Sequence, residues 1–328
     1  MKTIRIERYG GAEVLQRQDL PEPEPGPGDV LVRVRHAGIN FMDVHTRQGK
    51  YEGSRTYPVT LPCTLGMEGA GEVQRAGPGV EGFAPGARVA WCLSWGSYAE
   101  WAVVPAARLA PVPQALPLEL AAAAIFPGVT AHYLVHDLGA LAPGRSCLVH
   151  AASGVIGQLI VQWAVQRGAT VFATTSSEAK ARVARGHGAQ HVLGYAGFAD
   201  AVRAATGGLG VDVVFDPIGR DTLRESLRAT RRQGLVVNYG AVSGPVRDLD
   251  PIELGEAGSL FLTRPRLADH VADGDSLRRR AAAVFAALLD GSLRLDIGAR
   301  HTLDDVEAAH AALEERRALG KAVLTLPA

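Results

Sequence analysis

The amino-acid sequence predicts an α/β protein of two domains, in which a doubly wound parallel sheet is inserted into a β-rich domain. The chain has 328 residues, which exceeds the length over which a single hydrophobic core usually grows. Short alternating runs broken by Gly and Pro extend to about residue 120, and short apolar runs alternating with helical patterns follow them. A last apolar run at 322–326 needs a pairing partner, which the β-rich beginning of the chain can supply. We therefore expect one domain from residues 1–122 and 266–328 and a second from residues 123–265.

The composition is that of an ordinary globular protein with no excess of either charge. Hydrophobic residues make up 47% and charged residues 21% of the chain, which argues against long disordered stretches. Lys and Arg together number 34, as do Asp and Glu, so no net field favours nucleic acid or an anionic membrane surface. We expect neither as a partner.

The cysteines and the N-terminus indicate a cytoplasmic protein. The three cysteines, Cys63, Cys92 and Cys147, form no C-x-x-C pair, so the sequence signals neither a disulfide framework nor a structural zinc site. Residues 4–7 alternate apolar and charged side chains without the apolar segment of a signal peptide, which predicts an edge strand. No run approaches the roughly 18 consecutive apolar residues of a membrane span. We expect a soluble protein in a reducing compartment.

In the first part of the chain, alternating apolar and polar residues predict short strands. The proline-rich piece at 21–28 is more simply a connection between two early strands than a domain linker. The strand candidates lie at 30–35, 71–74, 88–91 and 98–104.

The second part begins with an alanine-rich helical pattern at 119–124, which resumes at 130–138. An apolar run at 146–150 follows, and further apolar runs alternate with helical patterns, which is typical of β-α-β units and a parallel sheet. These further strands are predicted at 170–175, 190–193, 211–215, 235–239 and 259–263. Two helices, at 276–290 and 303–317, precede the last strand.

A glycine-containing turn follows the strand at 146–150. The pattern Ala152-Ser153-Gly154-Val155-Ile156-Gly157 reads A-x-G-x-x-G, in which Gly154 lets phosphates approach the backbone and Gly157 lets helix and strand touch. Because the chain contains 38 glycines, the motif alone is weak. Its position between a strand and an amphipathic helix strengthens it, and together they predict a Rossmann dinucleotide site.

The end of the next strand distinguishes the two nicotinamide cofactors. An NAD enzyme places Asp or Glu here against the ribose 2′-hydroxyl, whereas this strand ends Thr174-Thr175-Ser176-Ser177, with Lys180 one turn into the helix. Hydroxyl groups and a cation suit a 2′-phosphate, so the sequence favours NADPH. Ser177 and Lys180 also suit a helix N-terminus, and the two roles are compatible.

With this motif in place, the chain resembles the zinc-free quinone oxidoreductase (zeta-crystallin-like) branch of the medium-chain dehydrogenase/reductase superfamily over nearly its whole length. The resemblance implies a Rossmann domain inserted in a GroES-like catalytic domain, and a homodimer. The matching segments are 10–15, 38–43, 66–71, 128–131, 216–222, 263–265 and 320–324.

The zinc alcohol dehydrogenases of the same superfamily differ at two positions that bind metal there. They carry a cysteine where Asn40 falls and a histidine where Met67 precedes Glu68. The cysteines of their structural zinc lobe are also missing, with Cys92 alone in that region. We therefore expect no metal, and no Lewis-acid chemistry of the kind that oxidises an alcohol.

The resemblance also implies residue roles. Asn40 and Thr130 would lie beside the nicotinamide with Tyr133 close to it, and Ser176 and Lys180 would hold the 2′-phosphate. Two of the remaining candidates have simple structural alternatives, because Tyr239 could be core and Arg317 a solvated charge at a helix end. The other implied cofactor contacts are Ser153, Gly154, Val155 and Ile156 at the pyrophosphate, Tyr195 on the adenosine side, Tyr239 and Gly240 along the groove, and Phe261, Thr263 and Arg317 closing it.

The candidates for the acceptor pocket are Asn40, His45, Tyr51 and Arg264. His45 stands where relatives often carry tyrosine, and the loop at 51–62 is longer than in relatives, so the choice of acceptor is open. Arg264 could stabilise negative charge on a quinone oxygen, or it could be a structural loop residue before a proline. Tyr51 or solvent could supply a proton, and no residue is assigned as the catalytic acid.

These features predict an NADPH-dependent quinone reductase, since a quinone accepts hydride without a metal. An NADPH-dependent enone or enoyl reductase on the same scaffold is one alternative, and an NADPH-binding structural or RNA-binding protein is another. The neutral net charge disfavours RNA binding. A short-chain reductase is excluded because no tyrosine is followed four positions later by lysine.

Overall fold

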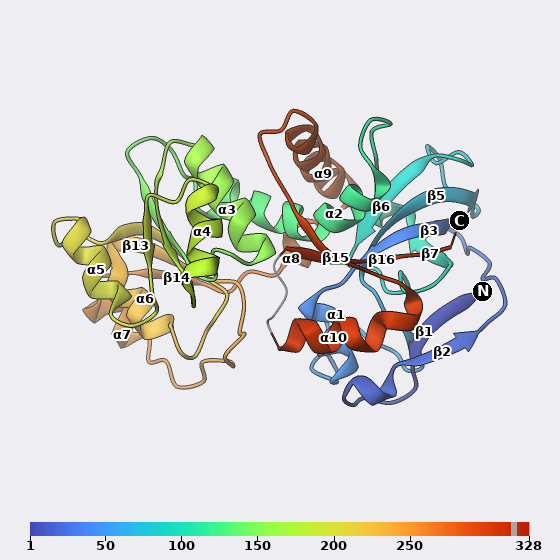
Figure 1. Ribbon diagram of the computed structural model, residues 1–328, viewed down its shortest axis with the longest axis horizontal. Coiled ribbons are helices and arrows are strands. Elements are labelled where there is room, and N and C mark those ends of the chain that lie inside the picture. Colours follow the sequence, from blue (N-terminus) through green and yellow to red (C-terminus); the bar gives the residue numbers. More distant parts are fainter. Residues whose placement is uncertain (316–319, 328) are drawn as a thin grey trace. The chain divides into compact units, whose positions relative to one another are not determined.

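The computed structural model describes residues 1–315 and 320–327 (Figure 1). The chain divides into two compact units. The first unit contains residues 1–129 and 270–328, and the second contains residues 130–269. The sequence analysis placed the domain boundaries at 122/123 and 265/266. The second unit is thus inserted in the sequence of the first.

Two sheets build the described part of the first unit. The larger follows the order β15-β16-β3-β5-β6-β8, with β7 paired to β3, and the smaller follows β2-β1-β4. Their apolar faces share one core, which includes Val32, Val34, Trp91 and Leu324. The strands of the larger sheet are β3 (Asp29–Gly38), β5 (Glu68–Ala76), β6 (Arg88–Cys92), β7 (Trp101–Pro105), β8 (Leu109–Pro111), β15 (Ile297–His301) and β16 (Lys321–Thr325). Those of the smaller are β1 (Lys2–Ile6), β2 (Gln16–Asp19) and β4 (Cys63–Thr64).

The prediction of an N-terminal edge strand is wrong, because β1 pairs with both β2 and β4. The alternation of side chains agrees with the burial of Ile4 and Ile6. It could not show that both backbone edges of β1 have partners, because side-chain alternation reports faces and not edges.

The pairing of the C-terminal strand with the β-rich part is confirmed. Strand β16 runs antiparallel to β3, with Val323 opposite Gly38 and Leu324 opposite Ala37. The Ile39 N–H donates to the Ala322 carbonyl at 3.0 Å, which extends the ladder by one bond. This register brings the start of β16 to the end of β3.

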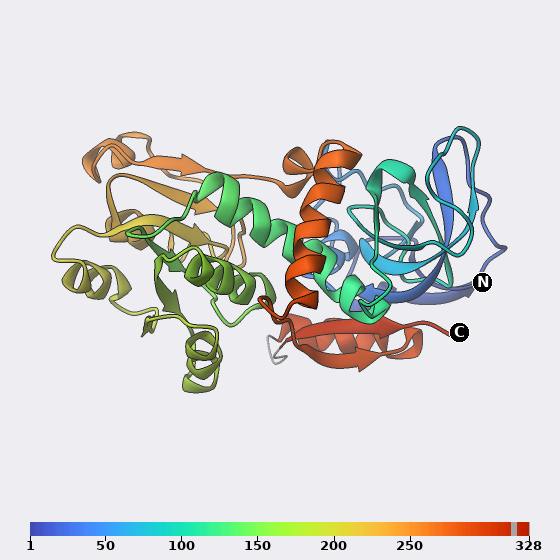
Figure 2. The same cartoon turned by 90° about the horizontal axis from the view of Figure 1, so that it is seen from above.

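The predicted helix at 119–124 and its resumption at 130–138 form one helix, α2 (Leu118–Tyr133), which continues into a π-helical turn (Leu134–Leu138). Pro127 and Gly128 do not interrupt it, and Gly128 allows α9 (Gly274–Leu289) to cross closely (Figure 2). Residues 118–138 are long and apolar enough to span a membrane, but 72% of that window is buried, as expected of a core helix. The remaining helices of the first unit are α1 (Phe41–Arg47), α10 (Val306–Glu314) and three 3-10 turns (Ala12–Val14, Ala106–Arg108 and Leu303–Asp305).

The second unit is the predicted doubly wound parallel sheet. Its strand order is β11-β10-β9-β12-β13-β14, so the sheet grows outward in both directions from β9 and β12. Helices α3 and α4 lie on one side of the sheet and α5 and α6 on the other (Figure 1). The strands are β9 (Ser146–Val149), β10 (Thr170–Thr174), β11 (His191–Leu193), β12 (Val211–Asp216), β13 (Thr230–Asn238) and β14 (Phe261–Thr263). The helices are α3 (Val155–Gln166), α4 (Glu178–Gly186), α5 (Phe198–Ala205), α6 (Leu223–Ala229) and α7 (Ile252–Glu256), with α8 (Leu267–His270) at the change of unit.

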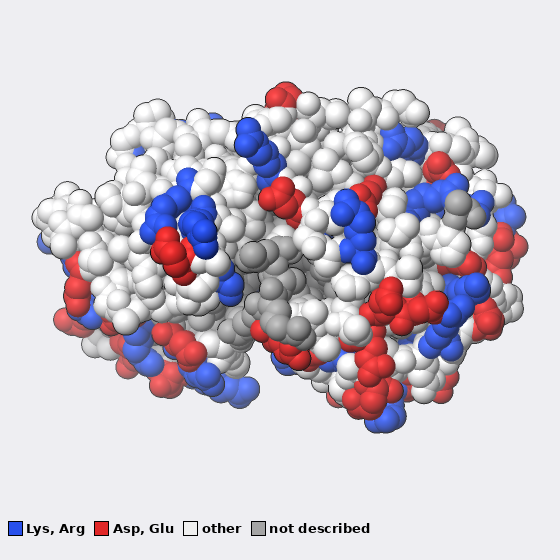
Figure 3. Space-filling view, in the orientation of Figure 1, with Lys and Arg blue, Asp and Glu red and all other residues white. Residues whose placement is uncertain are grey.

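The surface bears charges of both signs. On the face drawn in Figure 3, Lys and Arg side chains are interspersed with Asp and Glu. This mixture agrees with the equal numbers of basic and acidic residues, 34 of each.

Candidate functional site

The turn between β9 and α3 is shaped for close approach of backbones. Gly154 is the N-cap of α3 in extended conformation. A Cβ at Gly157 would lie 2.4 Å from the Ala151 carbonyl oxygen and 2.9 Å from the Ala152 Cα, so no side chain fits there. The Ala152 N–H donates to the Thr174 carbonyl at 3.2 Å, which ties the turn to β10.

The first turn of α3 is suited to an anion. In a helix the first N–H groups have no intrahelical acceptor, and here those of Val155 and Ile156 are among them. The positive end of the helix dipole adds to their attraction for negative charge. Ser153 holds the turn in shape, because its carbonyl accepts from Gln158 Nε2 at 2.6 Å.

Ser176 and Lys180, both implicated in 2′-phosphate binding, lie together at the end of β10. The Lys180 ammonium donates to Ser176 Oγ at 3.1 Å; Ser176 is exposed and Lys180 is half-buried. Ser177 caps α4, since its hydroxyl accepts from the Lys180 N–H at 3.4 Å. Glu178, the nearest carboxylate in the sequence, pairs with Arg185 at 2.6 Å. Capping and a hydroxyl–ammonium pair therefore coexist in this segment.

Two of the tyrosines predicted to contact the cofactor, Tyr133 and Tyr195, are close enough to the third, Tyr239, to affect its pKa. Burial raises the pKa of Tyr239, and Asp216, Tyr133 and Tyr195 add to the shift. The Tyr195 hydroxyl accepts from the Ala151 N–H at 3.1 Å, so it reaches the turn. A Cβ at the neighbouring Gly240 would lie 2.3 Å from the Pro217 carbonyl oxygen, which requires glycine at this position.

Sequence reasoning missed a buried polar chain beneath the turn. Ser226 Oγ donates to Asp216 Oδ2 at 2.9 Å, so the His150 Nε2–H, 2.9 Å away, donates to Ser226. His150 Nδ1 then accepts from the Thr174 hydroxyl at 2.8 Å. Burial lowers the pKa of His150 to about 4, although Asp216 opposes the shift. A neutral imidazole thus links the ends of β9, β10 and β12.

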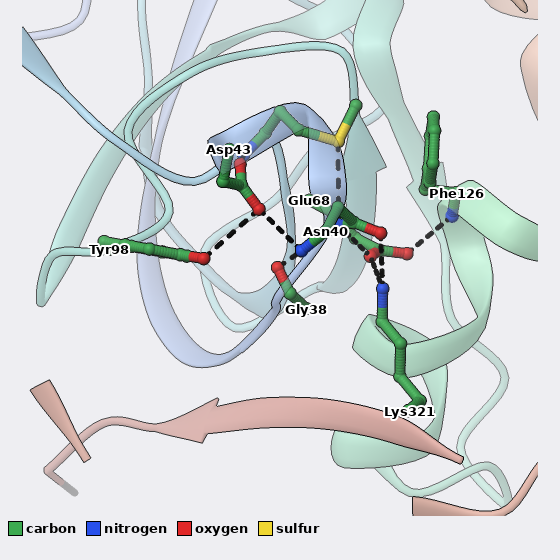
Figure 4. A network of polar contacts seen from close by, with 8 residues as sticks. Gly38, Asn40, Asp43, Glu68, Tyr98, Phe126 and Lys321 are labelled. Carbon is green, nitrogen blue, oxygen red and sulfur yellow. Dashed lines mark hydrogen bonds and ion pairs between the residues drawn. The ribbon is translucent and has the colours of Figure 1, made fainter. Parts of the chain in front are cut away.

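In the first unit, Asn40 belongs to a buried network that includes two residues the sequence did not suggest as partners (Figure 4). The Lys321 ammonium donates to Asn40 Oδ1 at 2.6 Å and to Glu68 Oε2 at 2.7 Å. Asn40 Nδ2 donates to the same Glu68 oxygen at 2.8 Å, and Glu68 Oε1 accepts from the Phe126 N–H at 2.6 Å. Burial raises the pKa of Glu68, while Lys321 and these hydrogen bonds oppose the shift.

Asp43 borders this network at the start of α1. Its carboxylate accepts from the Asn40 N–H at 2.8 Å, the Met67 N–H at 3.1 Å and the Tyr98 hydroxyl at 3.2 Å. Burial raises the pKa of Asp43 to about 7 against the effect of these donors and of Lys321. The capping box formed by Asn40 and Asp43 fixes where α1 begins.

Two acceptor-pocket candidates, His45 and Tyr51, lie in a row of rings. The rings of Phe41 and His45 are 6.2 Å apart, those of His45 and Tyr51 6.2 Å, and those of Tyr51 and Tyr57 5.4 Å. Burial lowers the pKa of His45 to about 4, and Lys50 adds to the shift. The row is therefore uncharged near neutral pH.

The remaining candidates occupy separate places. Thr130 lies in α2, Thr263 ends β14 and Arg264 follows it. Phe261 begins β14 at the edge of the sheet and is 64% exposed. Arg317 lies outside the described residues.

Across residues 1–315 and 320–327, no three or more His, Cys, Asp or Glu side chains are grouped so that they could hold a metal ion. Cys63, Cys92 and Cys147 are each free and buried.

Two family models match the chain. Residues 26–114 match the alcohol dehydrogenase GroES-like domain, and residues 155–266 match the zinc-binding dehydrogenase model. The first falls within the β-rich unit and the second within the unit of the parallel sheet.

Several known proteins are similar over almost their whole length. A quinone oxidoreductase of Pseudomonas aeruginosa is 38% identical, with 98% of this chain and 99% of that protein covered. A 2-haloacrylate reductase of a Burkholderia species is 37% identical, with 97% of each covered. The crystal structure of the Escherichia coli quinone oxidoreductase complexed with NADPH superposes with a TM-score of 0.94 at 33% identity, covering 99% of this chain and 100% of that one.

Proposed function

This chain belongs to the quinone oxidoreductase branch of the medium-chain dehydrogenase/reductase superfamily, and from this premise we propose that it is a zinc-independent reductase that passes hydride from NADPH to a quinone. The observation that carries the proposal is the exposed contact between Ser176 and Lys180 at the end of β10, beside a turn shaped for a pyrophosphate. A carboxylate at this strand end would repel the 2′-phosphate, whereas a hydroxyl and an ammonium bind it.

The second unit has residues suited to both the pyrophosphate and the 2′-phosphate of NADPH. The N–H groups of Val155 and Ile156 would bind the pyrophosphate, since they lack helical acceptors. Ser153 and Gly154 would shape that contact, and Tyr195 would cover the adenosine side. When bound, the nicotinamide supplies the hydride, and the protein supplies alignment.

For the nicotinamide, we propose contacts from Asn40 and Thr130, with Tyr133, Tyr239 and Gly240 lining the cofactor groove. Phe261, Thr263 and Arg317 would close it. The buried network around Asn40 supports a fixed geometry for its amide, because each polar atom of that amide has a charged partner.

For the acceptor, we propose the row of rings that includes His45 and Tyr51. An uncharged aromatic surface suits a planar quinone better than a charged substrate. Arg264 would stabilise negative charge on the reduced oxygen, and the proton would come from Tyr51 or solvent.

A second candidate is the reduction of an electron-poor carbon–carbon double bond conjugated to a carbonyl. The 2-haloacrylate reductase is 37% identical to this chain, against 38% for the quinone oxidoreductase of Pseudomonas aeruginosa and 35% for that of Salmonella typhimurium. Both reactions need the same hydride donor and differ in the acceptor.

The test is NADPH and NADH oxidation against a panel of quinones, α,β-unsaturated ketones and 2-haloacrylate, with wild type and Lys180→Ala. We expect the variant to lose at least about tenfold in kcat/KM for NADPH and to change little with NADH, because only NADPH carries the 2′-phosphate. Arg182→Ala is the matched control, since it removes another charge from α4.

Each outcome decides one part of the proposal. If Lys180→Ala keeps the preference for NADPH, the assignment of the 2′-phosphate site is wrong. Turnover of the enone or 2-haloacrylate in place of quinones would select the second candidate. Tight NADPH binding without turnover of any acceptor would instead favour a structural role, and a salt titration with single-stranded RNA would then test RNA binding.

We also propose that the protein is a cytoplasmic homodimer. Strand β14 is an edge strand of the parallel sheet, and the largely exposed Phe261 suits pairing with a second copy across a two-fold axis. The three free, buried cysteines suit a reducing compartment.

A further inference from the structure

Lys321 and Glu68 form an ion pair that is almost completely removed from solvent. Their side chains are 3% and 0% exposed, and the ammonium lies 2.7 Å from Glu68 Oε2. Strand pairing brings them together, because β3 pairs antiparallel with both β16 and β5. Asn40, two residues beyond the end of β3, completes the group.

Stability does not by itself explain this pair. Removing two charges from water costs several kcal/mol for each ion, and well-packed apolar residues of similar volume are often no less stable. The surrounding backbone is also shaped to admit the carboxylate. A Cβ at Gly38 would lie 2.1 Å from Glu68 Oε2, so only glycine leaves room for it.

The arrangement of charges determines how the amide of Asn40 is turned. Its oxygen faces the Lys321 ammonium at 2.6 Å, and its nitrogen faces the Glu68 carboxylate at 2.8 Å. A flip of the amide would place NH2 against the ammonium and oxygen against the carboxylate. Both contacts would then be repulsive, so the two charges select one orientation of a side chain whose two ends have nearly the same shape.

We propose that Lys321 is a positioning residue that, together with Glu68, locks the Asn40 amide for contact with the nicotinamide. This inference rests on the proposed place of Asn40 beside that ring. Lys321 acts through Asn40, and its contribution is the alignment of the reacting carbon before hydride transfer.

Lys321→Met tests the proposal, because it keeps the length of the side chain and removes the charge. The variant leaves Glu68 without its counter-ion and frees Asn40 Oδ1. We expect kcat to fall by about tenfold or more, since small errors of alignment are costly for hydride transfer. The dissociation constant of NADPH should change less than about threefold, because most of the proposed phosphate contacts come from the other unit.

Two further variants separate positioning from folding. In Glu68→Gln/Lys321→Met, no unpaired buried charge remains, so the thermal midpoint should recover while kcat stays low. Arg35→Met is the control, because Arg35 pairs with Glu72 at 2.8 Å between β3 and β5 in the same sheet, and the structure records no contact of it with Asn40. It should leave kcat unchanged.

Three readouts are needed: thermal unfolding, the fluorescence of bound NADPH, and kcat with NADPH deuterated at C4. A misaligned ring should shift nicotinamide fluorescence and increase the isotope effect in Lys321→Met. Recovery of kcat together with the thermal midpoint in the double variant would overturn the proposal, as would a Lys321→Met enzyme with unchanged kcat and fluorescence.

This design separates failure of the inference from failure of the proposed function. If the wild type binds NADPH but reduces no acceptor, the proposed activity is wrong, and the fluorescence of bound NADPH still tests Lys321. If the wild type reduces quinones and Lys321→Met does so equally well, the activity stands and the role of Lys321 is wrong.

Discussion

Asp43 is buried in surroundings that accommodate both of its protonation states. As a carboxylate it accepts from two backbone N–H groups and from the Tyr98 hydroxyl. When protonated it can donate to Tyr98, because that hydroxyl also lies 3.3 Å from His310 Nε2 and can donate there instead. Burial lowers the pKa of His310 to about 3, so its ring is neutral and able to accept.

We predict that Asp43 makes the free energy of unfolding depend on pH. The pKa of Asp43 is about 7 in the folded protein against 3.8 in the reference state, so the folded state retains the proton where the unfolded chain has lost it. Protonated Asp43 therefore stabilises the folded protein at low pH. This contribution to the free energy of unfolding decreases by about 1.4 kcal/mol per pH unit as the pH rises toward 7.

Urea unfolding at pH 5 and pH 8 checks this prediction. The stability of Asp43→Asn relative to wild type should increase by about 2.5 kcal/mol between these pH values, since Asn never ionises. A difference that is independent of pH would mean that Asp43 is charged in the folded protein throughout this range. In Tyr98→Phe the pKa of Asp43 should rise further, because the carboxylate loses one hydrogen-bond donor, so stability should begin to level off at a higher pH.

At the scale of residues, sequence reasoning identified those whose chemistry is written in a local motif. Ser153 and Gly154 follow β9, and Ser176 and Lys180 follow β10, so the four residues lie in two successive strand–turn–helix units. The residue types and spacing in these units predict phosphate contacts. Sequence reasoning missed Glu68 and Lys321 as partners of Asn40, because the pairs are separated by 28 and 281 positions in the chain. Lys321 lies in the segment 320–324 that matches the family, but nothing in that segment indicates that its side chain is buried.

At the scale of elements, the crossing of α2 and α9 depends on one missing side chain. A Cβ at Gly128 would lie 2.6 Å from Val284 Cγ1 and 2.9 Å from its Cγ2. Glycine weakens a helix by about 1 kcal/mol relative to alanine, so its presence in α2 is offset by close packing. Val284 cannot easily move away, because a β-branched side chain in a helix has one strongly preferred rotamer.

We predict that Gly128→Ala destabilises the protein by about 1–2 kcal/mol, despite the better helix former. Val284→Ala should be destabilising alone and should relieve the clash in the double variant. A double-mutant cycle by urea unfolding should therefore give a favourable coupling of about 1 kcal/mol. Simple additivity would show that the crossing adapts to the extra methyl group.

Elements were predicted best where a periodic pattern was bounded by turn residues. The strands of the parallel sheet and α9 were confirmed within two residues at each end, except that β13 begins at Thr230, five residues before the predicted start. The break expected in α2 was wrong because a proline and a glycine suggest a break locally, whereas packing against α9 favours continuity. Strand β15 was not predicted, since its residues are only partly buried or exposed and show no apolar alternation.

At the scale of the whole molecule, the exposed edge at β14 predicts how two copies associate. Phe261 is 64% exposed and Leu209, in the same unit, is 71% exposed, so both can be replaced without disturbing a core. If β14 pairs across a two-fold axis, Phe261→Glu introduces like charges that face each other and should shift the dimer toward monomer by at least about tenfold in dissociation constant.

Sedimentation equilibrium of wild type, Phe261→Glu and Leu209→Glu measures this shift. The Leu209 variant controls for the added negative charge and should associate as the wild type does. If both variants weaken association equally, or if neither weakens it, the interface lies elsewhere. A wild type that is monomeric at all concentrations would refute the dimer itself.

The sequence by itself determined the features that arise from neighbouring residues. Periodicity predicted the β-rich and parallel-sheet parts, and the segment from Ala152 to Lys180 predicted the dinucleotide fold and the preference for NADPH. These inferences hold because turn geometry, helix starts and side-chain alternation act over a few residues.

Only the tertiary structure decided which distant residues share one environment. The pairing of β16 with β3 places the Lys321 ammonium beside Asn40, and the pairing of β3 with β5 brings the Glu68 carboxylate to both. Strand register and burial are collective properties of the folded chain, and they turn an ordinary lysine and glutamate into a buried ion pair. For that reason the cofactor could be inferred from local sequence, whereas the groups proposed to align it could not.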